Sequence, residues 1–290
     1  MIPFATKDKP IRASYLSWVA RCSMKPVLDM VDDADTTGAA AQIGSVVHAG
    51  IAAFHLTPGE QAARVAAAFE AARGALQQYP LADENECRLF LTPYCADPRN
   101  AAAIFARVPA GYTGGGHPDA GRIKAGQPAI ELPVRFQLKP HRLDPTGEAI
   151  WVDGTLDQLR MDGGKPTVCD AKTGQPTGLQ MLHDYAYQIA AYTLGARQCG
   201  WPDTEPGEII RLRRYRERNA ALPNPSGVHW SMPFTAADCE MLLDTVRLNV
   251  ALIRSGNVTF GAGVQCTYCP HRGLDGCIPK AKQKLGITLA

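Results

Sequence analysis

The clearest pattern of hydrophobic and polar positions lies in residues 151–174, where apolar and β-branched residues flank the Asp-Gly-Gly sequence at 162–164. An aspartate followed by glycines between two such runs is typical of a tight turn that joins two strands. We therefore predict a β-hairpin here. On its second strand, Asp170 and Lys172 are two residues apart, so the twofold period of a strand directs both side chains to one face.

Similar patterns predict the other elements. Strict alternation of apolar and polar residues at 129–139 predicts a half-buried strand, and Pro133 places it at the edge of a sheet. A further strand is expected to begin at Glu208, and residues 81–126 are less regular. Apolar spacing of three to four residues predicts helices at 14–22, 41–55, 59–79, 179–199 and 235–255. The mixture predicts an α/β fold.

Composition sets broad limits on the class of protein. A chain of 290 residues with 46% hydrophobic residues and no biased tract can bury a sizeable core, as one large domain or as one domain with a helical annex. A net charge of +2 requires any affinity for DNA to come from a local patch. We find no apolar signal region after the N-terminus and no run close to the roughly 18 apolar residues of a membrane span. We therefore expect a cytoplasmic protein without a membrane partner.

The hairpin carries the candidate chemistry. Asp157 on the first strand and Asp170 on the second are carboxylates of the kind that hold a hard divalent cation such as Mg²⁺. Lys172 beside them can orient or activate a water, which together suits metal-assisted phosphodiester hydrolysis. Asp153, four residues before Asp157, is a rival metal ligand. The alternative is a surface hairpin whose charged side chains form solvated pairs.

Basic residues cluster after the strand that begins at Glu208. Guanidinium groups suit phosphate, and an interleaved tyrosine can stack on an unpaired base. This segment is either a DNA contact or a solvated face. The candidates for DNA binding are Arg211, Arg213, Arg214, Tyr215 and Arg216.

Cysteines indicate a second metal site. In a reducing compartment the nine cysteines are metal ligands, catalytic groups or core thiols rather than a disulfide framework. Cys266, Cys269 and Cys277 lie close together with proline and glycine between them, and a Cys-x₂-Cys pair lets two thiolates reach one metal. Three thiolates need a fourth ligand, either His271 at a zinc site or Cys22.

The motif GTLD at 154–157, followed by DAK at 170–172, resembles the core of the PD-(D/E)XK nuclease superfamily and specifically its RecB-like branch. The resemblance implies a restriction-endonuclease-like core, a small mixed sheet flanked by helices. It assigns Asp157 as the first metal-binding aspartate, Asp170 as the second acid and Lys172 as the catalytic lysine. The Ala171 carbonyl would join the metal ligands.

Four further residues extend this resemblance. The G-x-x-x-H pattern that ends at His48 resembles the family's first motif, whose histidine joins the metal ligands. Gln188 and Tyr192 resemble the Q-x-x-x-Y motif, which implies that Gln188 supports Lys172 or the DNA backbone. Glu131 begins the 129–139 strand and is a candidate metal ligand or an acid bordering the site. Alternatively, His48 is a packing residue, Gln188 and Tyr192 are the flank of an amphipathic helix, and Glu131 is solvated.

The spacing around Cys22, S-x-L-x₅-C-x₃-P, resembles iron-sulfur members of this branch, namely AddB-type nucleases and the CRISPR-adaptation exonucleases. That resemblance implies a 4Fe-4S cluster that ties together the two ends of the chain. Zinc is the alternative metal. The implied ligands are Cys22, Cys266, Cys269 and Cys277.

These patterns predict one nuclease domain over 1–290, with an N-terminal helical part (14–126), a core (127–218) and a C-terminal helix with the cysteines (219–290). The resemblance implies a Mg²⁺- or Mn²⁺-dependent DNA exonuclease that acts on ends or single strands. Its partners would be recombination or CRISPR-adaptation proteins, in a phage, in CRISPR adaptation or in DNA repair. A non-catalytic DNA-binding or scaffolding module and a zinc-containing regulator are the alternatives.

Overall fold

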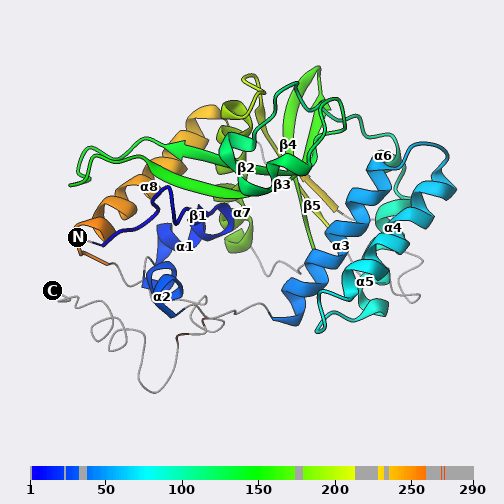
Figure 1. Ribbon diagram of the computed structural model, residues 1–290, viewed down its shortest axis with the longest axis horizontal. Coiled ribbons are helices and arrows are strands. Elements are labelled where there is room, and N and C mark those ends of the chain that lie inside the picture. Colours follow the sequence, from blue (N-terminus) through cyan, green and yellow to red (C-terminus); the bar gives the residue numbers. More distant parts are fainter. Residues whose placement is uncertain are drawn as a thin grey trace.

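The computed structural model describes residues 2–22, 24–32, 38–173, 179–212, 228–231, 235–258, 269 and 271. Figure 1 shows their arrangement. The strands are β1 (Ile11–Arg12), β2 (Ile130–Leu138), β3 (Ile150–Asp162), β4 (Lys165–Lys172), β5 (Glu205–Arg211) and β6 (Val228–Ser231). The helices are α1 (Leu16–Arg21), α2 (Met24–Asp32), α3 (Ala39–Leu56), α4 (Gln61–Leu76), α5 (Glu84–Ala96), α6 (Pro98–Ala101), α7 (Leu179–Gln198) and α8 (Ala236–Arg254).

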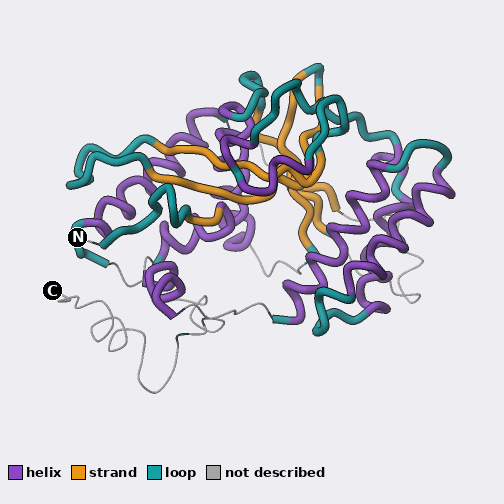
Figure 2. Tube along the Cα trace, viewed as in Figure 1, coloured by secondary structure: helices purple, strands orange, loops and turns teal. Residues whose placement is uncertain are grey.

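The strands form one mixed sheet, drawn in orange between the helices in Figure 2. Its order is β1-β3-β4-β5-β6, and β2 pairs with β3 alone. β3 is antiparallel to β2 and β4, whereas β4 and β5 are parallel and are joined through α7. A parallel pair needs such a long crossover connection, usually a helix. This mixed α/β architecture is consistent with a restriction-endonuclease-like fold.

Helices cover both faces of the sheet because strands β4 and β5 bury apolar side chains in both directions. Val168 and Ile209 belong to the core that includes α7 and α8. Cys169, Ala171 and Ile210 belong to a second core formed with α3, α4 and α5. In Figure 1 these three helices lie together at one end of the sheet. The ends of β4 and β5 are therefore enclosed between α3 and α7.

The hairpin and the edge strand match the sequence predictions. Gly163 and Gly164 connect β3 to β4, and both have positive φ angles, 54° and 84°, which glycine adopts at little cost. Pro133 lies in β2, an edge strand. The predicted start of the last long helix is confirmed as well, because Thr235 and Asp238 form a capping box at α8.

The structure differs from the predictions in several elements. Residues 81–126, expected to be less regular, contain α5, which Asp83 caps and which carries Pro93 in its interior. A proline is unfavourable inside a helix, so this helix depends on its packing against α3 and α4. The sequence pattern also did not indicate α2, β1 or β6.

Helix α3 is more apolar than the sequence analysis allowed. Its 18 residues have a mean hydropathy of 1.3, which meets the length and composition of a membrane span, although only weakly. The helix instead buries Val46, Val47, Ile51 and Phe54 against α4 and α5, as a core helix does. The prediction that no apolar run reaches this length was wrong.

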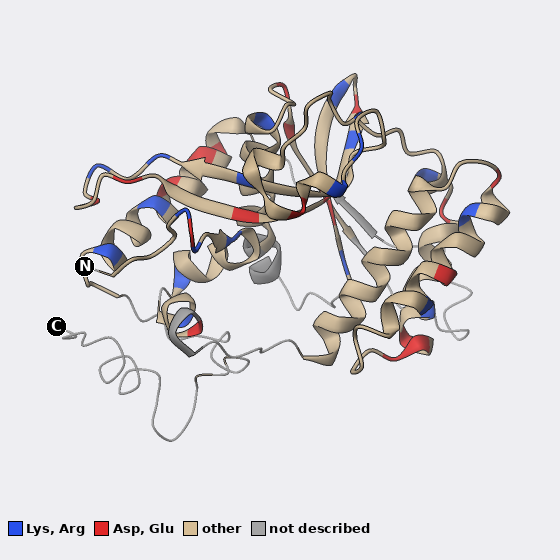
Figure 3. Cartoon of the chain, in the orientation of Figure 1, with Lys and Arg blue, Asp and Glu red and all other residues tan. Residues whose placement is uncertain are grey.

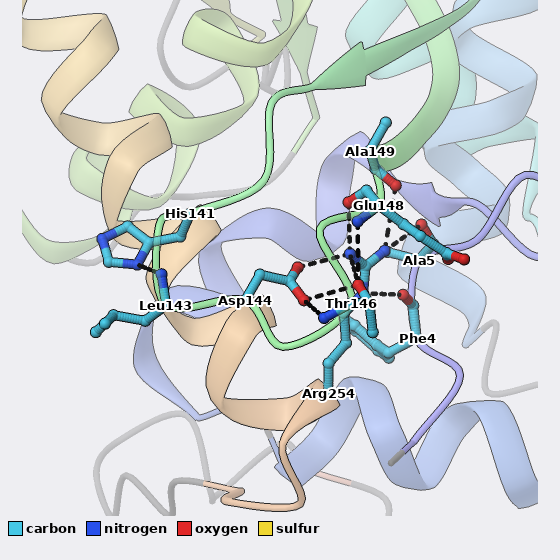
Figure 4. Close-up of polar contacts among 9 residues, drawn as sticks. All are labelled: Phe4, Ala5, His141, Leu143, Asp144, Thr146, Glu148, Ala149 and Arg254. Atoms are coloured by element: carbon cyan, nitrogen blue, oxygen red, sulfur yellow. Dashed lines mark hydrogen bonds and ion pairs between the residues drawn. The ribbon is translucent and has the colours of Figure 1, made fainter.

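The two ends of the described chain are held together by Arg254, the last residue of α8 (Figure 4). Its side chain is 2% exposed and is ion-paired with Asp144, whose side chain is 0% exposed, at 2.7 Å. The guanidinium also donates to the carbonyls of Phe4, Ala5, Glu148 and Ala149. One side chain thus joins the N-terminal segment, the β2–β3 loop and the end of α8.

Candidate active site

The hairpin places two carboxylates side by side. The β3–β4 register pairs Gln158 with Cys169, so the preceding Asp157 and the following Asp170 lie opposite one another. The Ala171 backbone N–H donates to Oδ2 of Asp157 at 2.7 Å and fixes that carboxylate against β4. Both acids are buried, with 6% of Asp157 and 0% of Asp170 exposed. Burial of two adjacent carboxylates is costly unless cations or hydrogen bonds compensate.

His48 on α3 joins this pair from a distant part of the sequence. Its Nδ1 lies 3.4 Å from Oδ1 of Asp157, and its Nε2 lies 3.0 Å from the Ala171 carbonyl oxygen. Although burial lowers the pKa of His48, the Asp157 and Glu131 carboxylates raise it well above its ordinary value. The histidine therefore belongs to an acidic cluster rather than to the apolar core of α3.

Glu131 on β2 completes the cluster. The β2–β3 register places it opposite Asp157, and its Oε1 lies 3.3 Å from Nδ1 of His48. Its φ of 49° is in the left-handed region, which a residue with a side chain seldom adopts. Such backbone strain, of about 1–3 kcal/mol, concentrates at functional sites. Ligand atoms of His48, Glu131 and Asp157 all lie within 4.8 Å of one another, close enough to share one metal ion.

Asp170 faces Lys172 rather than this three-residue group. The Lys172 Nζ lies 2.6 Å from Oδ2 of Asp170. This contact is a charge-assisted pair, and it leaves Oδ1 of Asp170 without a hydrogen-bond partner among the described residues. Burial raises the pKa of Asp170 to about 7, and the Asp157 charge adds to this effect while Lys172 opposes it. Burial lowers the pKa of Lys172, but Asp170 and Asp157 raise it more.

Helix α7 closes the site behind Lys172. Gln188 donates to the hydroxyl of Tyr192 at 3.4 Å, and both residues are buried. Burial, together with the Asp157 and Asp170 charges, raises the pKa of Tyr192. The sequence analysis did not assign a role to Tyr185, yet Lys172 Nζ lies 5.4 Å from its ring centroid. Tyr185 lies three residues before Gln188 on α7, and this spacing is the signal that indicates it.

A cavity of about 1560 Å³ opens onto these residues. Its walls include His48, Glu131, Asp157, Lys172 and Tyr185. Helix α3 forms one wall with small residues and carries no Asp, Glu, Lys or Arg, as its tan colour shows in Figure 3. Arg122 also lines the cavity, and no motif in the sequence indicated it. The cavity is large enough for an extended ligand to reach the acids.

Several other candidate residues lie apart from this cluster. Asp153 is ion-paired with Arg135 at 3.1 Å, so it does not compete with Asp157 for the place beside His48. Arg211 ends β5 in register with Lys172. The DNA-binding candidates Arg213, Arg214, Tyr215 and Arg216 and the cysteines Cys266 and Cys277 lie outside the described residues. Cys22 is buried with Met24, Leu28 and Val258, and Cys269 is half-buried.

A family model of the PD-(D/E)XK nuclease superfamily matches residues 12–274, most of the chain. The chain belongs to this superfamily. Membership implies a nuclease that depends on a divalent metal and acts on DNA, and the described residues include a candidate site for such a metal. The match is to the PD-(D/E)XK superfamily as a whole, so the RecB-like iron-sulfur branch stays a prediction. No curated protein matches the chain.

Proposed function

We propose that this chain is a Mg²⁺- or Mn²⁺-dependent DNA exonuclease that hydrolyses phosphodiester bonds at DNA ends or in single strands. The observation that carries the proposal is the convergence of His48, Glu131 and Asp157 beside Lys172, in one cavity. Superfamily membership supports the reaction class.

The donor set fits a hard or borderline divalent cation. Carboxylate oxygens are the preferred ligands of Mg²⁺, and imidazole is a suitable ligand for Mn²⁺. Asp157, Glu131 and His48 would hold the ion, with the Ala171 carbonyl next to them. Asp170 supports this interpretation, because it is fully buried and Lys172 pairs with its Oδ2 alone, which leaves Oδ1 without a hydrogen-bond donor in the described part of the chain. A bound cation would compensate this buried negative charge.

The protein's own groups then have distinct tasks. When bound, the cation supplies positive charge that polarises the scissile phosphate and activates a water. Lys172, held between Asp170 and the Tyr185 ring, keeps an ammonium at the cavity wall, where it positions the attacking oxygen and offsets the negative charge that develops on the phosphate. Gln188 and Tyr192 support this arrangement from α7.

The test is digestion of end-labelled single- and double-stranded DNA with Mg²⁺ or Mn²⁺. We expect Lys172→Ala to lower the rate by about 10²–10³-fold, because a positioned charge is lost. Lys165→Ala is the matched control, since Lys165 is on the same strand, is exposed and is paired only with Glu205 among the described residues. Full activity of Lys172→Ala would refute the site.

Covalently closed circular single-stranded DNA separates exonuclease from endonuclease activity. An exonuclease leaves the circle intact and degrades the same sequence once it is linear. Cleavage of the circle would overturn the exonuclease assignment while leaving the nuclease assignment in place. Both substrates are incubated with the metal present, and the need for the metal is tested separately by omitting Mg²⁺ and Mn²⁺.

A 4Fe-4S cluster on Cys22, Cys266, Cys269 and Cys277 is the second part of the proposal. Its support is that the chain after α8 returns to the region of Cys22. Val258 packs with Cys22, and Nε2 of His271 lies 2.6 Å from Oδ1 of Asp29 on α2. That contact occupies one ring nitrogen of His271, the residue that would be the fourth ligand if the metal were zinc.

Metal analysis of anaerobically purified protein tests the cluster. Serine in place of Cys22 should release the iron and lower the melting temperature, because cluster binding stabilises only the folded chain. Cys239→Ser is the matched control, since Cys239 is a buried thiol of α8 outside the proposed set. Iron retained in Cys22→Ser, or zinc in place of iron, would contradict the assignment.

A further inference from the structure

A second cavity of about 320 Å³ lies at the C-terminal end of α3. Leu56 and Gln127 line the first cavity, and the residues that follow them in the chain, Thr57 and Pro128, line the second. His48 lines the first cavity and His55 the second. Seven residues of α-helix separate them, a rise of about 10 Å at 1.5 Å per residue. The two cavities are therefore neighbours along α3.

Two arginines line this second cavity, and no Asp or Glu is among its lining residues. Arg64 donates from Nε to the Phe54 carbonyl at 3.0 Å and from Nη1 to the Ala101 carbonyl at 2.9 Å. These two bonds hold its guanidinium in one orientation. Arg107 is exposed and donates to the Gly126 carbonyl at 3.3 Å. Within the described ranges neither arginine has an ion-pair partner, so their charge is available to an anion.

The histidine between these groups does not offset that charge. His55 is hydrogen-bonded to the Tyr94 hydroxyl at 2.7 Å, and Nη2 of Arg64 lies 3.5 Å from its Nδ1. Burial, and then the charges of Arg160 and Arg64, lower the pKa of His55 to about 3. The imidazole is therefore neutral near pH 7. The cavity has a positive wall without a negative counterpart in this part of the structure.

The remaining wall suits the sugar and base of a nucleotide. Ile104 is 69% exposed and lines the cavity beside Phe105, whose ring contacts His55. Grooves that bind single-stranded nucleic acid combine positive charge along the backbone with aromatic side chains for the bases, and Phe105 is an aromatic residue of this wall. A guanidinium fork matches the oxygens of a phosphate.

We propose that Arg64 and Arg107 form a subsite for a backbone phosphate of the DNA strand whose scissile bond lies beside His48. The inference rests on the proposed nuclease function and adds a contact that extends the substrate-binding surface. The rise of about 10 Å along α3 between His48 and His55 places this subsite away from the scissile position, so the phosphate it binds is a different one on the same strand. The subsite therefore requires a strand that continues past the cleavage point.

Arg107 provides the cleaner test, because Arg64 also holds two backbone carbonyls and its loss can disturb the fold. Binding of fluorescein-labelled single-stranded DNA is measured by anisotropy over a range of salt concentrations, with EDTA present to prevent cleavage. We expect Arg107→Gln to reduce the slope of log K against log salt by about 0.7, the value for one phosphate contact with a single strand. Arg142→Gln is the matched control, an exposed arginine that lines neither cavity. An unchanged slope in Arg107→Gln would overturn the subsite.

A scan with methylphosphonate linkages separates a subsite from a general positive field. Each strand of six nucleotides carries one neutral linkage at a different position. We expect a neutral linkage at one position, away from the scissile linkage, to weaken binding to the wild type but not to Arg107→Gln. Equal effects of every linkage on both proteins would show only a diffuse field and would overturn the proposal. A wild type that neither binds nor cleaves DNA would refute the proposed function itself, which the cleavage assay detects independently.

Discussion

Arg254 is the side chain whose loss should destabilise this fold most clearly. Its guanidinium makes six hydrogen bonds to the N-terminal segment and the β2–β3 loop, including those to Asp144 and Thr146. Replacing it with methionine keeps much of the volume but removes the charge and every donor. α8 would then lose its attachment to residues 4–5 and 144–149. The chain that follows α8 leads to the cysteine segment, so this attachment also bears on the proposed cluster.

The magnitude follows from the environment of Asp144. Without Arg254, the donors left to its carboxylate among the described residues are the N–H and hydroxyl of Thr146, at 2.9 and 2.7 Å, and its side chain is 0% exposed. Removing one partner of a buried ion pair leaves an uncompensated charge and costs about 3–5 kcal/mol. We expect Arg254→Met to lower the free energy of unfolding by this amount, a large share of the roughly 5–15 kcal/mol of a typical domain.

Urea unfolding followed by tryptophan fluorescence measures this free energy. Arg247→Met is the matched control on the same helix, because Arg247 pairs with Glu240 and Asp244, whose side chains are 64% and 61% exposed. Pairs with exposed partners contribute about 0–1 kcal/mol. If Arg254→Met costs no more than Arg247→Met, the reasoning is refuted.

A double-mutant cycle identifies the buried charge as the cause. In an Asp144→Asn background the carboxylate is absent, so Arg254→Met should cost clearly less than in the wild type. If the two single effects add within about 0.5 kcal/mol, Asp144 and Arg254 are not coupled and the explanation fails.

The same pair predicts a dependence on pH. Although burial opposes it, hydrogen bonds from Thr146 and Arg254 hold the pKa of Asp144 below its ordinary value. The stability that this carboxylate contributes is therefore present above its unfolded pKa of about 3.9 and is lost as the pH falls through the lower folded value. We expect the free energy of unfolding of Asp144→Asn to fall less steeply than that of the wild type below about pH 4. An equally steep fall in both proteins would contradict this.

Two further substitutions test the site and its support. A Cβ added at Gly154 would lie 2.9 Å from the Tyr192 hydroxyl. We therefore expect Gly154→Ala to displace Tyr192 and to lower the initial rate of DNA cleavage by about 10–100-fold. An unaltered rate would show that Tyr192 has no part in the site. Tyr94→Phe removes a hydroxyl that lies 2.7 Å from His55 and 2.8 Å from Gln158. Urea unfolding should show that the free energy of unfolding falls by about 1–3 kcal/mol. A decrease below about 0.5 kcal/mol would mean that this hydroxyl is dispensable.

The sequence by itself determined the elements whose signals are local. The hairpin was predictable because its two glycines and its alternating strands are encoded within 24 residues, 151–174. The cap of α8 was predictable because Thr235 and Asp238 are three residues apart. The same local spacing identified Asp157, Asp170 and Lys172 as candidates, since a strand brings alternate residues to one face.

Only the tertiary structure decided how these candidates are grouped. His48 and Glu131 are 83 residues apart, and His48 and the Ala171 carbonyl are 123 apart, so no spacing rule relates them. The structure gathers His48, Glu131 and Asp157 into one group and directs Asp170 toward Lys172. The sequence pattern indicates each of these residues only separately, partly through resemblance to a family.

Other features have no local signal at all. Arg254 and Phe4 are 250 residues apart, and Arg64 and Arg107 meet only because α4 and the segment before β2 border the end of α3. Helix α5 forms despite Pro93, because its packing against α3 and α4 outweighs its unfavourable local sequence. Local propensities contribute from tenths of a kcal/mol to about 3 kcal/mol per residue. Burial of apolar side chains and pairing of buried charges act between distant segments, and their contributions to the free energy of folding are often larger. Those long-range terms determine where the site lies and which charges surround it.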